Sequence, residues 1–227
     1  MHKNVYHKPT FDNISEEKRK KILDVAVNEF ANNGFENANI NTIAKKADVS
    51  VGSLYKYFDT KADLFLTSVN YGVSSLEKIL AQVVSLEEDV MLKLEKLVRA
   101  AISYSRENAV MIKLYNEFTT ESNAELGEKL AERMESITAD AYRKAIIKGQ
   151  IDGEIRADID PGMAALMVDN MLMNLQFSYA CTYYGRRLSI YAGKDIFEKD
   201  DFVVENVLRF IKSALKPNIY PERNVNI

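Results

Sequence analysis

The chain has 227 residues, 47% of them hydrophobic, and carries 30 Lys and Arg against 33 Asp and Glu. This length and apolar content are enough for a sizeable core. No run of about 18 apolar residues is present, and the first residues, MHKNVYHKPTFDN, lack the apolar stretch of a signal peptide. We therefore expect a cytoplasmic protein with no membrane partner.

Cysteine and histidine are too scarce for several kinds of site. Cys181, the single cysteine, has no second Cys or His near it in the sequence, so we expect a core position, with a redox-sensing thiol as the alternative. The two histidines, His2 and His7, fall in an N-terminal arm that we expect to be mobile. With no phosphate-binding glycine loop either, we expect no catalysis, no metal and no cofactor.

The chain contains four prolines and nine glycines, and it shows no strand-like alternation bounded by turn residues. This pattern predicts an all-α fold.

Residues 39–58, NINTIAKKADVSVGSLYKYF, predict two short helices joined by a tight turn. Asn39 can cap the first helix, and Ser50 begins the second, in which Leu54 and Phe58 can pack inward. In the first helix, apolar residues recur at helical spacing: Ile40, Ile43, Ala44 and Ala47. A helix as short as the second fits a DNA major groove about 12 Å wide.

This segment and its flanks resemble the DNA-binding domain of TetR-family transcriptional regulators. Upstream, ILDVAVNEFANNGF (22–35) resembles the family's first helix, closed by a glycine and an aromatic residue. Downstream, YKYFDTKADLF (55–65) resembles the end of the recognition helix, a short turn and the start of helix four. The resemblance implies a three-helix helix-turn-helix domain at 15–62 and a ligand-binding and dimerisation domain of about six helices at 63–217.

Two residues depart from the family pattern. Asp48 stands where the family usually has glycine, and aspartate tolerates a left-handed backbone better than most residues do. Its carboxylate should point away from phosphates or cap the next helix. Val51 replaces a residue that is more often polar or basic, and it offers a methyl surface that suits a thymine methyl group.

By resemblance, the DNA-facing positions lie on and beside the second helix, with packing as the alternative role for Tyr55 and Tyr57. Charge supports this end of the chain, because residues 1–61 hold ten Lys and Arg against eight Asp and Glu, whereas the remainder holds 20 against 25. The expected DNA-binding residues are Asn39, Ser50, Val51, Gly52, Ser53, Tyr55, Lys56, Tyr57 and Lys61.

Beyond Phe65, long amphipathic patterns predict helices near 60–84, 87–107, 109–119, 123–150, 160–184 and 200–215. Asp152-Gly153 should end one of them, and Asp160-Pro161 should cap the next. Gly185 should end that helix, which leaves 186–199 as a connection containing at most a short turn of helix.

The last two helices carry broad apolar faces, which must be buried against the subunit's own core or against a second copy. The family resemblance implies a homodimer with a four-helix interface, and a dimer suits a pseudo-palindromic site in double-stranded DNA. The expected interface residues are Met163, Met167, Met171, Phe202, Val207, Phe210 and Ile211.

The helices between these two regions are where the family places its ligand cavity. Seven of the eight methionines fall after residue 90, with several aromatic residues among them, which suits an adaptable apolar pocket but suits an ordinary core equally well. For Asn170 and Asn174, the alternative is hydrogen bonding across the dimer. The expected ligand-binding residues are Tyr104, Met111, Tyr115, Phe118, Met134, Tyr142, Asn170, Asn174 and Phe177.

We therefore expect a homodimeric, sequence-specific DNA-binding repressor that an unknown apolar or aromatic small molecule releases from its operator. The alternative is an architectural or interaction protein that binds DNA without a small-molecule signal. Ligand binding should act through helix four, which runs from the DNA-facing end into the second domain.

Overall fold

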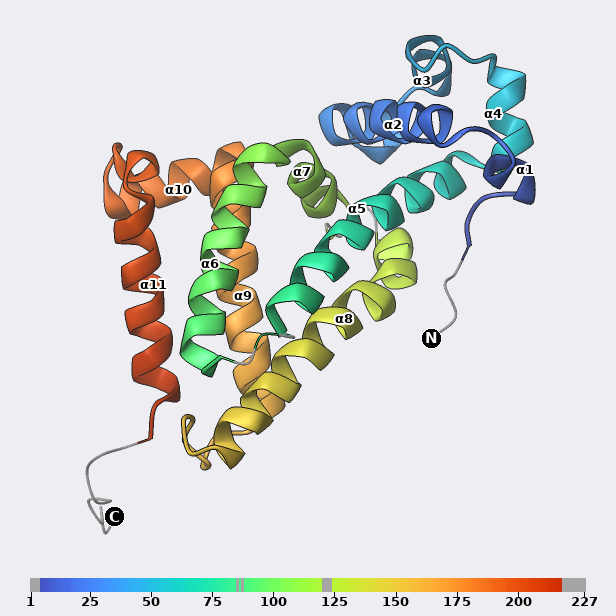
Figure 1. Cartoon of the computed structure of the whole chain (residues 1–227). Helices are drawn as coiled ribbons and strands as arrows, with labels where there is room; N and C mark the ends of the chain where they lie inside the picture. The colour runs from blue at the N-terminus through green and yellow to red at the C-terminus, as the bar shows by residue number, and fades with distance from the viewer. Residues whose placement is uncertain (1–4, 85, 87, 120–123, 218–227) are drawn as a thin grey trace.

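The computed structural model describes residues 5–84, 86, 88–119 and 124–217, and within them every regular element is a helix (Figure 1). The expected all-α fold is confirmed. The first five helices are α1 (Pro9–Asp12), α2 (Glu16–Asn37), α3 (Ile40–Lys46), α4 (Val51–Tyr57) and α5 (Lys61–Val84). The rest are α6 (Val90–Glu107), α7 (Ala109–Phe118), α8 (Ala124–Ile151), α9 (Pro161–Ala180), α10 (Thr182–Ala192), a 3-10 turn at Ile196–Glu198 and α11 (Asp200–Leu215).

Helices α1 to α4 form a small unit at one end of the molecule (Figure 1). Its core contains Phe30, Ile43 and Leu54, and it continues into α5 through the fully buried Phe65. Leu114 of α7 belongs to the same core, so the unit is fastened to the larger domain by apolar packing. The expected domain boundary between residues 62 and 63 falls in the first turn of α5.

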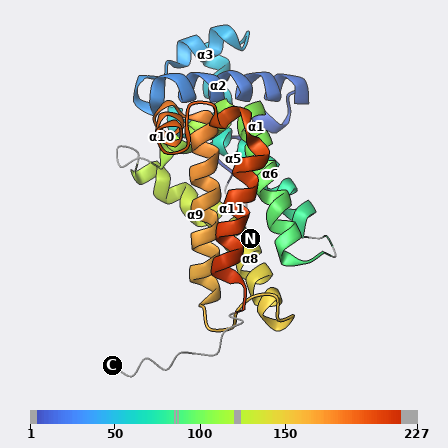
Figure 2. The ribbon, with the colours of Figure 1, turned by 90° about the vertical axis from the view of Figure 1, so that its left-hand side faces the viewer.

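The larger domain is built around α9, which packs against α6, α8 and α10 (Figure 1). Its core includes Val98 of α6, Ile146 of α8, Leu172 of α9 and Val204 of α11. Figure 2 shows α9 and α11 running side by side along one face. No helix in the described part of the chain is long and apolar enough to cross a membrane.

Local caps set most helix ends where the sequence predicts them. The Asp160 carboxylate accepts a hydrogen bond from the Met163 N–H (2.8 Å) at the start of α9, with Pro161 in the first turn. Gly153, with φ of 75°, follows the end of α8. Both of these predicted helix ends are confirmed.

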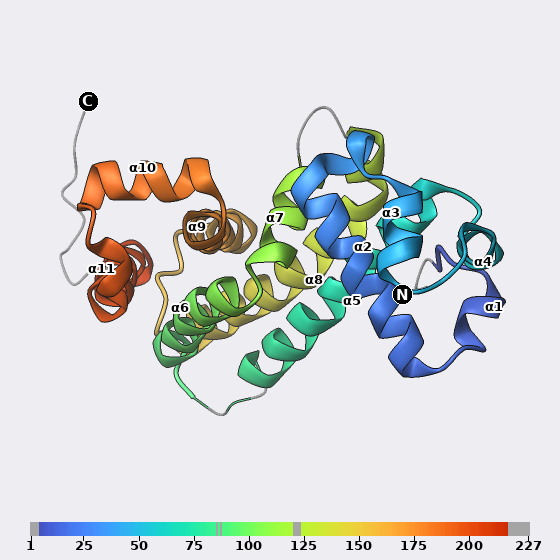
Figure 3. The same ribbon diagram turned by 90° about the horizontal axis from the view of Figure 1, so that it is seen from above.

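The connection expected at 186–199 is wrong, because a separate helix, α10, extends through its first half (Figure 3). The preceding helix ends at Ala180, and the extended backbone of Cys181 separates it from α10. Gly185 lies inside α10, where a Cβ atom would approach the Ser178 carbonyl oxygen to 3.0 Å. This glycine therefore permits close packing between α9 and α10, and Gly193, with φ of 97°, follows the end of α10.

Candidate DNA-binding site

Helices α3 and α4 are each capped by the side chain that precedes them. The Asn39 side-chain oxygen accepts a hydrogen bond from the Asn41 N–H (2.8 Å), and the Ser50 hydroxyl accepts one from the Ser53 N–H (3.0 Å). These caps satisfy backbone donors that have no partner within the helix. The predicted pair of short helices is therefore present.

The turn between the two helices contains a left-handed residue. Asp48 has φ of 58°, in the backbone region that its sequence position indicated. The adjacent Val49 N–H closes the turn onto the Ala44 carbonyl oxygen at 3.0 Å. Asp48 is exposed, and the cap of α4 comes from Ser50.

One face of α4 is open to solvent. It presents Gly52, the half-exposed Ser53 and Tyr55, and the exposed Lys56. A Cβ atom on Gly52 would have only the Ser50 hydroxyl within 4 Å, so the backbone there is accessible to a large partner. Leu54, on the opposite side, is buried as predicted.

Two of the expected DNA-binding residues serve mainly in packing. Tyr57 is only 8% exposed, and its ring centroid lies 5.6 Å from that of Phe11. Val51 is half-buried against the core of the same domain. Both contacts reduce the side-chain surface that either residue can offer to DNA.

Asn39 and Lys61 also have partners within the domain. The Asn39 side-chain oxygen is occupied by its cap to Asn41. The Lys61 ammonium donates to the Glu36 carbonyl oxygen (2.9 Å) and lies 4.8 Å from the centroid of the Phe35 ring. Contact between Lys61 and a phosphate would use its remaining donors.

The N-terminal arm holds the far end of α4, which the sequence did not reveal. The Lys8 N–H donates to the Tyr57 carbonyl oxygen (2.8 Å), and the Lys8 ammonium donates to the Tyr55 carbonyl oxygen (3.0 Å). The Thr10 hydroxyl donates to the Lys56 carbonyl oxygen. The last three carbonyl groups of α4 thus all have partners.

The expected mobility of the arm around His7 is therefore wrong. His7 contacts Asp12 at 3.0 Å and packs edge-to-face on Phe11. His2 lies outside the described residues. No local sequence pattern predicts the packing of Phe11 against α4, because the two segments are distant in the sequence and meet only in the folded protein.

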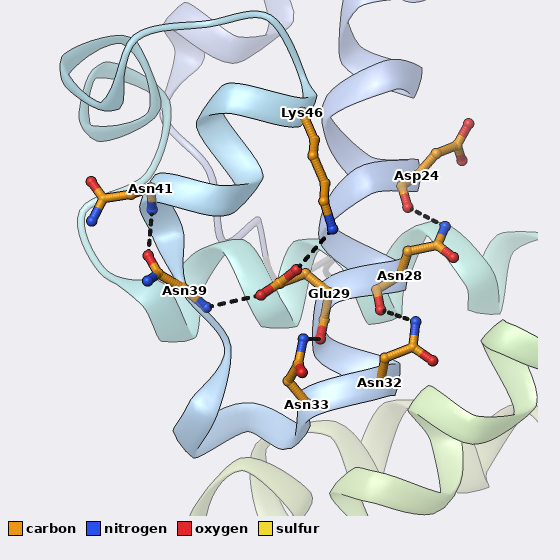
Figure 4. Close-up of polar contacts among 8 residues, drawn as sticks. All are labelled: Asp24, Asn28, Glu29, Asn32, Asn33, Asn39, Asn41 and Lys46. Atoms are coloured by element: carbon orange, nitrogen blue, oxygen red, sulfur yellow. Dashed lines mark hydrogen bonds and ion pairs between the residues drawn. The ribbon is translucent and has the colours of Figure 1, made fainter.

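A buried acid on α2, Glu29, fixes the orientation of α3 (Figure 4). Its side chain is only 6% exposed, and Oε1 accepts a hydrogen bond from the Asn39 N–H (3.3 Å) while Oε2 pairs with the Lys46 ammonium (3.4 Å). A buried carboxylate is stable only with such partners. In the sequence, Glu29 lies at helical spacing from Ile22 and Ala26, which are both buried. This spacing was the available signal that Glu29 is buried.

In the larger domain, three of the expected ligand-binding residues come together in the interior. The Tyr115 and Phe177 rings lie 5.6 Å apart, and the Tyr115 hydroxyl donates to Glu135 (3.1 Å) and contacts the Met173 sulfur (3.6 Å). Tyr142 is buried nearby, and the pKa of both phenols is raised by burial and by the charge of Asp169.

Asp169 is the only charged residue in α9. It borders this interior, although it is not among the ligand-binding residues expected from the sequence. Its pKa is raised to about 6, first by burial and then by repulsion from Glu135. A single acid in an otherwise apolar helix was the available signal. The interior is thus apolar and aromatic with an acidic border.

The other expected ligand-binding residues make different contacts, or their side chains lie outside the described residues. Met111 packs against Gly72, where an added Cβ atom would overlap the methionine methyl group. Burial raises the pKa of the Tyr104 phenol. The exposed Asn174 amide donates to the Asn170 carbonyl oxygen (2.8 Å), within α9. The side chains of Phe118 and Met134 lie outside the described residues.

The expected dimer residues divide into two groups. Met163, Met167, Phe202 and Phe210 are between 51% and 64% exposed although apolar. Met171 and Val207 are half-buried. Ile211 is only 1% exposed, so its placement on an open interface is wrong, because its side chain fills the core of its own subunit.

A groove of about 330 Å³ lies between α9 and α11, with Met163, Met167 and Met171 on one side and Ile211 and Leu215 on the other. Among the residues that the structure describes, no group of three or more His, Cys, Asp or Glu is arranged to hold a metal ion. Cys181 is half-buried, and burial raises the pKa of its thiol.

Known proteins share this organisation. Residues 22–67 match the family model described as "Bacterial regulatory proteins, tetR family". The "Probable acrEF/envCD operon repressor" of Escherichia coli (strain K12) is 24% identical over 204 residues, covering 84% of this chain and 85% of the relative. The "Fatty acid metabolism regulator protein" of Bacillus subtilis (strain 168) is 26% identical over 157 residues, covering 66% and 77% of the two chains.

The fold is also shared with a solved structure, the regulator FadR from Bacillus subtilis in complex with stearoyl-CoA. The TM-score is 0.70 at 20% sequence identity, and the match covers 86% of this chain and 98% of that one. The segment that matches the family model, residues 22–67, contains α3, the turn at Asp48 and α4. Residues 22–67 of this chain therefore carry the N-terminal domain of the TetR family of bacterial regulatory proteins, and the chain as a whole is similar to regulators of that family.

Proposed function

We propose that this chain is a homodimeric repressor that reads a pseudo-palindromic operator with α4 and leaves it when a small apolar or aromatic molecule binds the larger domain. The proposal rests first on the open face of α4. Gly52 permits close approach of the backbone, Ser53 and Tyr55 offer hydroxyl groups, and Lys56 offers a cation for a base or phosphate. The caps at both ends of α4 hold that face in a fixed orientation.

The exposed apolar face of α9 and α11 supports the dimer. Side chains such as Met167 and Phe210 remain half-exposed or more, which is costly for large apolar groups in water. A second copy placed by a two-fold axis would cover the same face on both subunits. It would also hold two α4 helices about 34 Å apart, one turn of DNA.

The interior around Tyr115 and Phe177 supports an effector of apolar or aromatic character. The stearoyl-CoA in the Bacillus FadR structure supports an acyl chain as one such class. An effector of this kind would displace α7 or α5 and change the separation of the α4 helices. By linkage, it would weaken DNA binding by the factor by which DNA weakens its own binding.

The proposal is tested by measuring the mass of the protein in solution and then titrating a fluorescent operator duplex with it, with and without a series of acyl-CoA esters and aromatic compounds. We expect twice the chain mass and release of the duplex by at least one compound class. A monomer would contradict the dimer. Operator binding that no compound alters would favour DNA binding without a small-molecule signal.

A further inference from the structure

Helix α2 is kinked at Gly34, and its last residues, 34–37, form with Ala38 a tight turn that leads into α3 (the α2–α3 turn). Gly34 has φ of 72°, and its carbonyl oxygen accepts a hydrogen bond from the Ala38 N–H at 3.1 Å. The next residue, Asn39, already caps α3. Any displacement of this turn therefore reaches α3 directly and, through the Asp48 turn, α4.

Three different helices hold the polar groups of this turn. Glu29 of α2 accepts the Asn39 N–H (3.3 Å), and Lys61 of α5 donates to the Glu36 carbonyl oxygen (2.9 Å). The third contact comes from α7, where Glu117 Oε1 accepts the Phe35 N–H at 3.2 Å. Glu29 lies in α2 and Lys61 is the first residue of α5, whereas Glu117 lies in α7 of the larger domain.

The approach of Glu117 to the turn is close. A Cβ atom at position 34 would lie 2.8 Å from Glu117 Oε1, so any side chain there would press on the carboxylate. Glycine at this position thus meets two needs, the positive φ and the space for Glu117. The Glu117 carboxylate can therefore reach the Phe35 N–H, the first backbone donor after Gly34.

We propose that Glu117 is a positioning residue for DNA recognition, which holds the α2–α3 turn, and through it α3 and α4, in the orientation that fits the operator. This inference rests on the proposed function. A hydrogen bond from a backbone N–H to a carboxylate is stronger than one between neutral groups, so a single contact can fix the turn. It gives the larger domain a direct connection to α3 that does not pass along α5.

The position of Glu117 on α7 also relates this contact to the interior of the larger domain. Tyr115, two residues earlier on the same ten-residue helix, contacts Phe177 and Glu135. A short packed helix moves as a unit. A molecule that displaces α7 at Tyr115 would therefore also displace the Glu117 carboxylate from Phe35.

The test compares Glu117→Ala and Glu117→Gln with the wild type, using the full chain, an operator selected by the wild type and a random duplex of equal length. Glu125→Ala is the control, because that exposed glutamate pairs with Lys129 on its own helix. Thermal unfolding of each variant is measured alongside, and hydrogen exchange follows the amides of residues 35–39.

We expect Glu117→Ala to weaken operator binding about tenfold, the effect of losing one charge-assisted hydrogen bond, while binding to the random duplex stays unchanged. Exchange at residues 35–39 should become faster, and Glu117→Gln, which keeps an acceptor oxygen, should recover most of the affinity. A merely structural role would lower the unfolding temperature and both affinities together.

A failure of the positioning role can be told apart from a failure of DNA recognition. If the wild type binds its operator and a folded Glu117→Ala binds it equally well, Glu117 has no positioning role and the proposed function stands. Equal losses in Glu117→Ala and Glu117→Gln would also overturn the role of the accepted hydrogen bond. If the wild type selects no operator, the proposed function itself is wrong, and the positioning role falls with it.

Discussion

The Phe11 ring lies 5.6 Å from the Tyr57 ring, so the short N-terminal helix α1 supports the end of α4. Phe11 is 2% exposed and also packs against Phe58 at 4.8 Å. Because Lys8 and Thr10 bind the last carbonyl groups of α4, loss of this packing should loosen both contacts at once.

Replacing Phe11 with alanine should therefore destabilise the DNA-binding domain by about 3 kcal/mol, the usual cost of removing a buried aromatic ring. Operator affinity should fall with it. Urea unfolding and operator titration measure the two effects, and Val5→Ala, at an exposed position in the same arm, is the control. A Phe11→Ala variant with unchanged stability would show that α1 does not support α4.

Lys56 is exposed on α4 and has no ion pair among the described residues. If it contacts a phosphate, Lys56→Ala should weaken binding to all sequences alike and reduce the slope of log affinity against log salt by about 0.9. Titrations at several salt concentrations measure the slope. Lys144→Ala, at an exposed position on α8, should leave it unchanged. An altered base preference without a change in slope would instead assign Lys56 to base recognition.

Asp169 should make stability depend on pH. Its pKa in the folded state is raised to about 6, so the folded protein holds this proton more tightly than the unfolded chain does. The ionised carboxylate thus destabilises the fold progressively as pH rises from about 4 to about 6, by at most about 3 kcal/mol. Asp169→Asn removes this cost, and it should stabilise the protein by about 1 kcal/mol more near pH 7.5 than near pH 5.

Urea unfolding of wild type and Asp169→Asn at the two pH values measures this difference. Asp140→Asn, on the exposed side of α8, should change stability equally at both. If Asp169→Asn behaves like that control, Asp169 titrates in the fold as an ordinary surface acid.

The apolar face of α9 and α11 should hold the dimer. Phe210→Ser removes a large exposed apolar group from the proposed interface, and it should shift the protein toward monomer at micromolar concentration. Sedimentation velocity measures the distribution. Ile151→Ser, which changes an even more exposed apolar residue at the end of α8, should leave the dimer intact. Identical sedimentation of Phe210→Ser and wild type would place the interface elsewhere.

The helix-turn-helix was predictable because its determinants are local. Asn39 and Ser50 are caps, and Leu54 follows helical spacing, so neighbouring residues define the two short helices. The role of Tyr57 was not predictable in this way. Its burial depends on Phe11, which is distant in the sequence and reaches it only through the tertiary fold.

Helix α10 shows the same limit in the larger domain. Gly185 looked like a stop signal, yet its effect is to let α10 approach the Ser178 carbonyl of α9. Glu29 and Glu117 likewise act on residues of other helices, through contacts that helical periodicity does not encode. Periodicity and capping predicted most helix ends, whereas these contacts between helices depend on the tertiary fold.

DNA reading by α4 is tested most directly by selecting bound sequences from a random DNA pool with the purified full chain and titrating the most enriched sequence at two salt concentrations. We predict enrichment of a pseudo-palindrome whose half-site centres lie about 34 Å apart, bound with nanomolar affinity that falls as salt rises. A folded protein that enriches no sequence would contradict the central claim that α4 reads DNA.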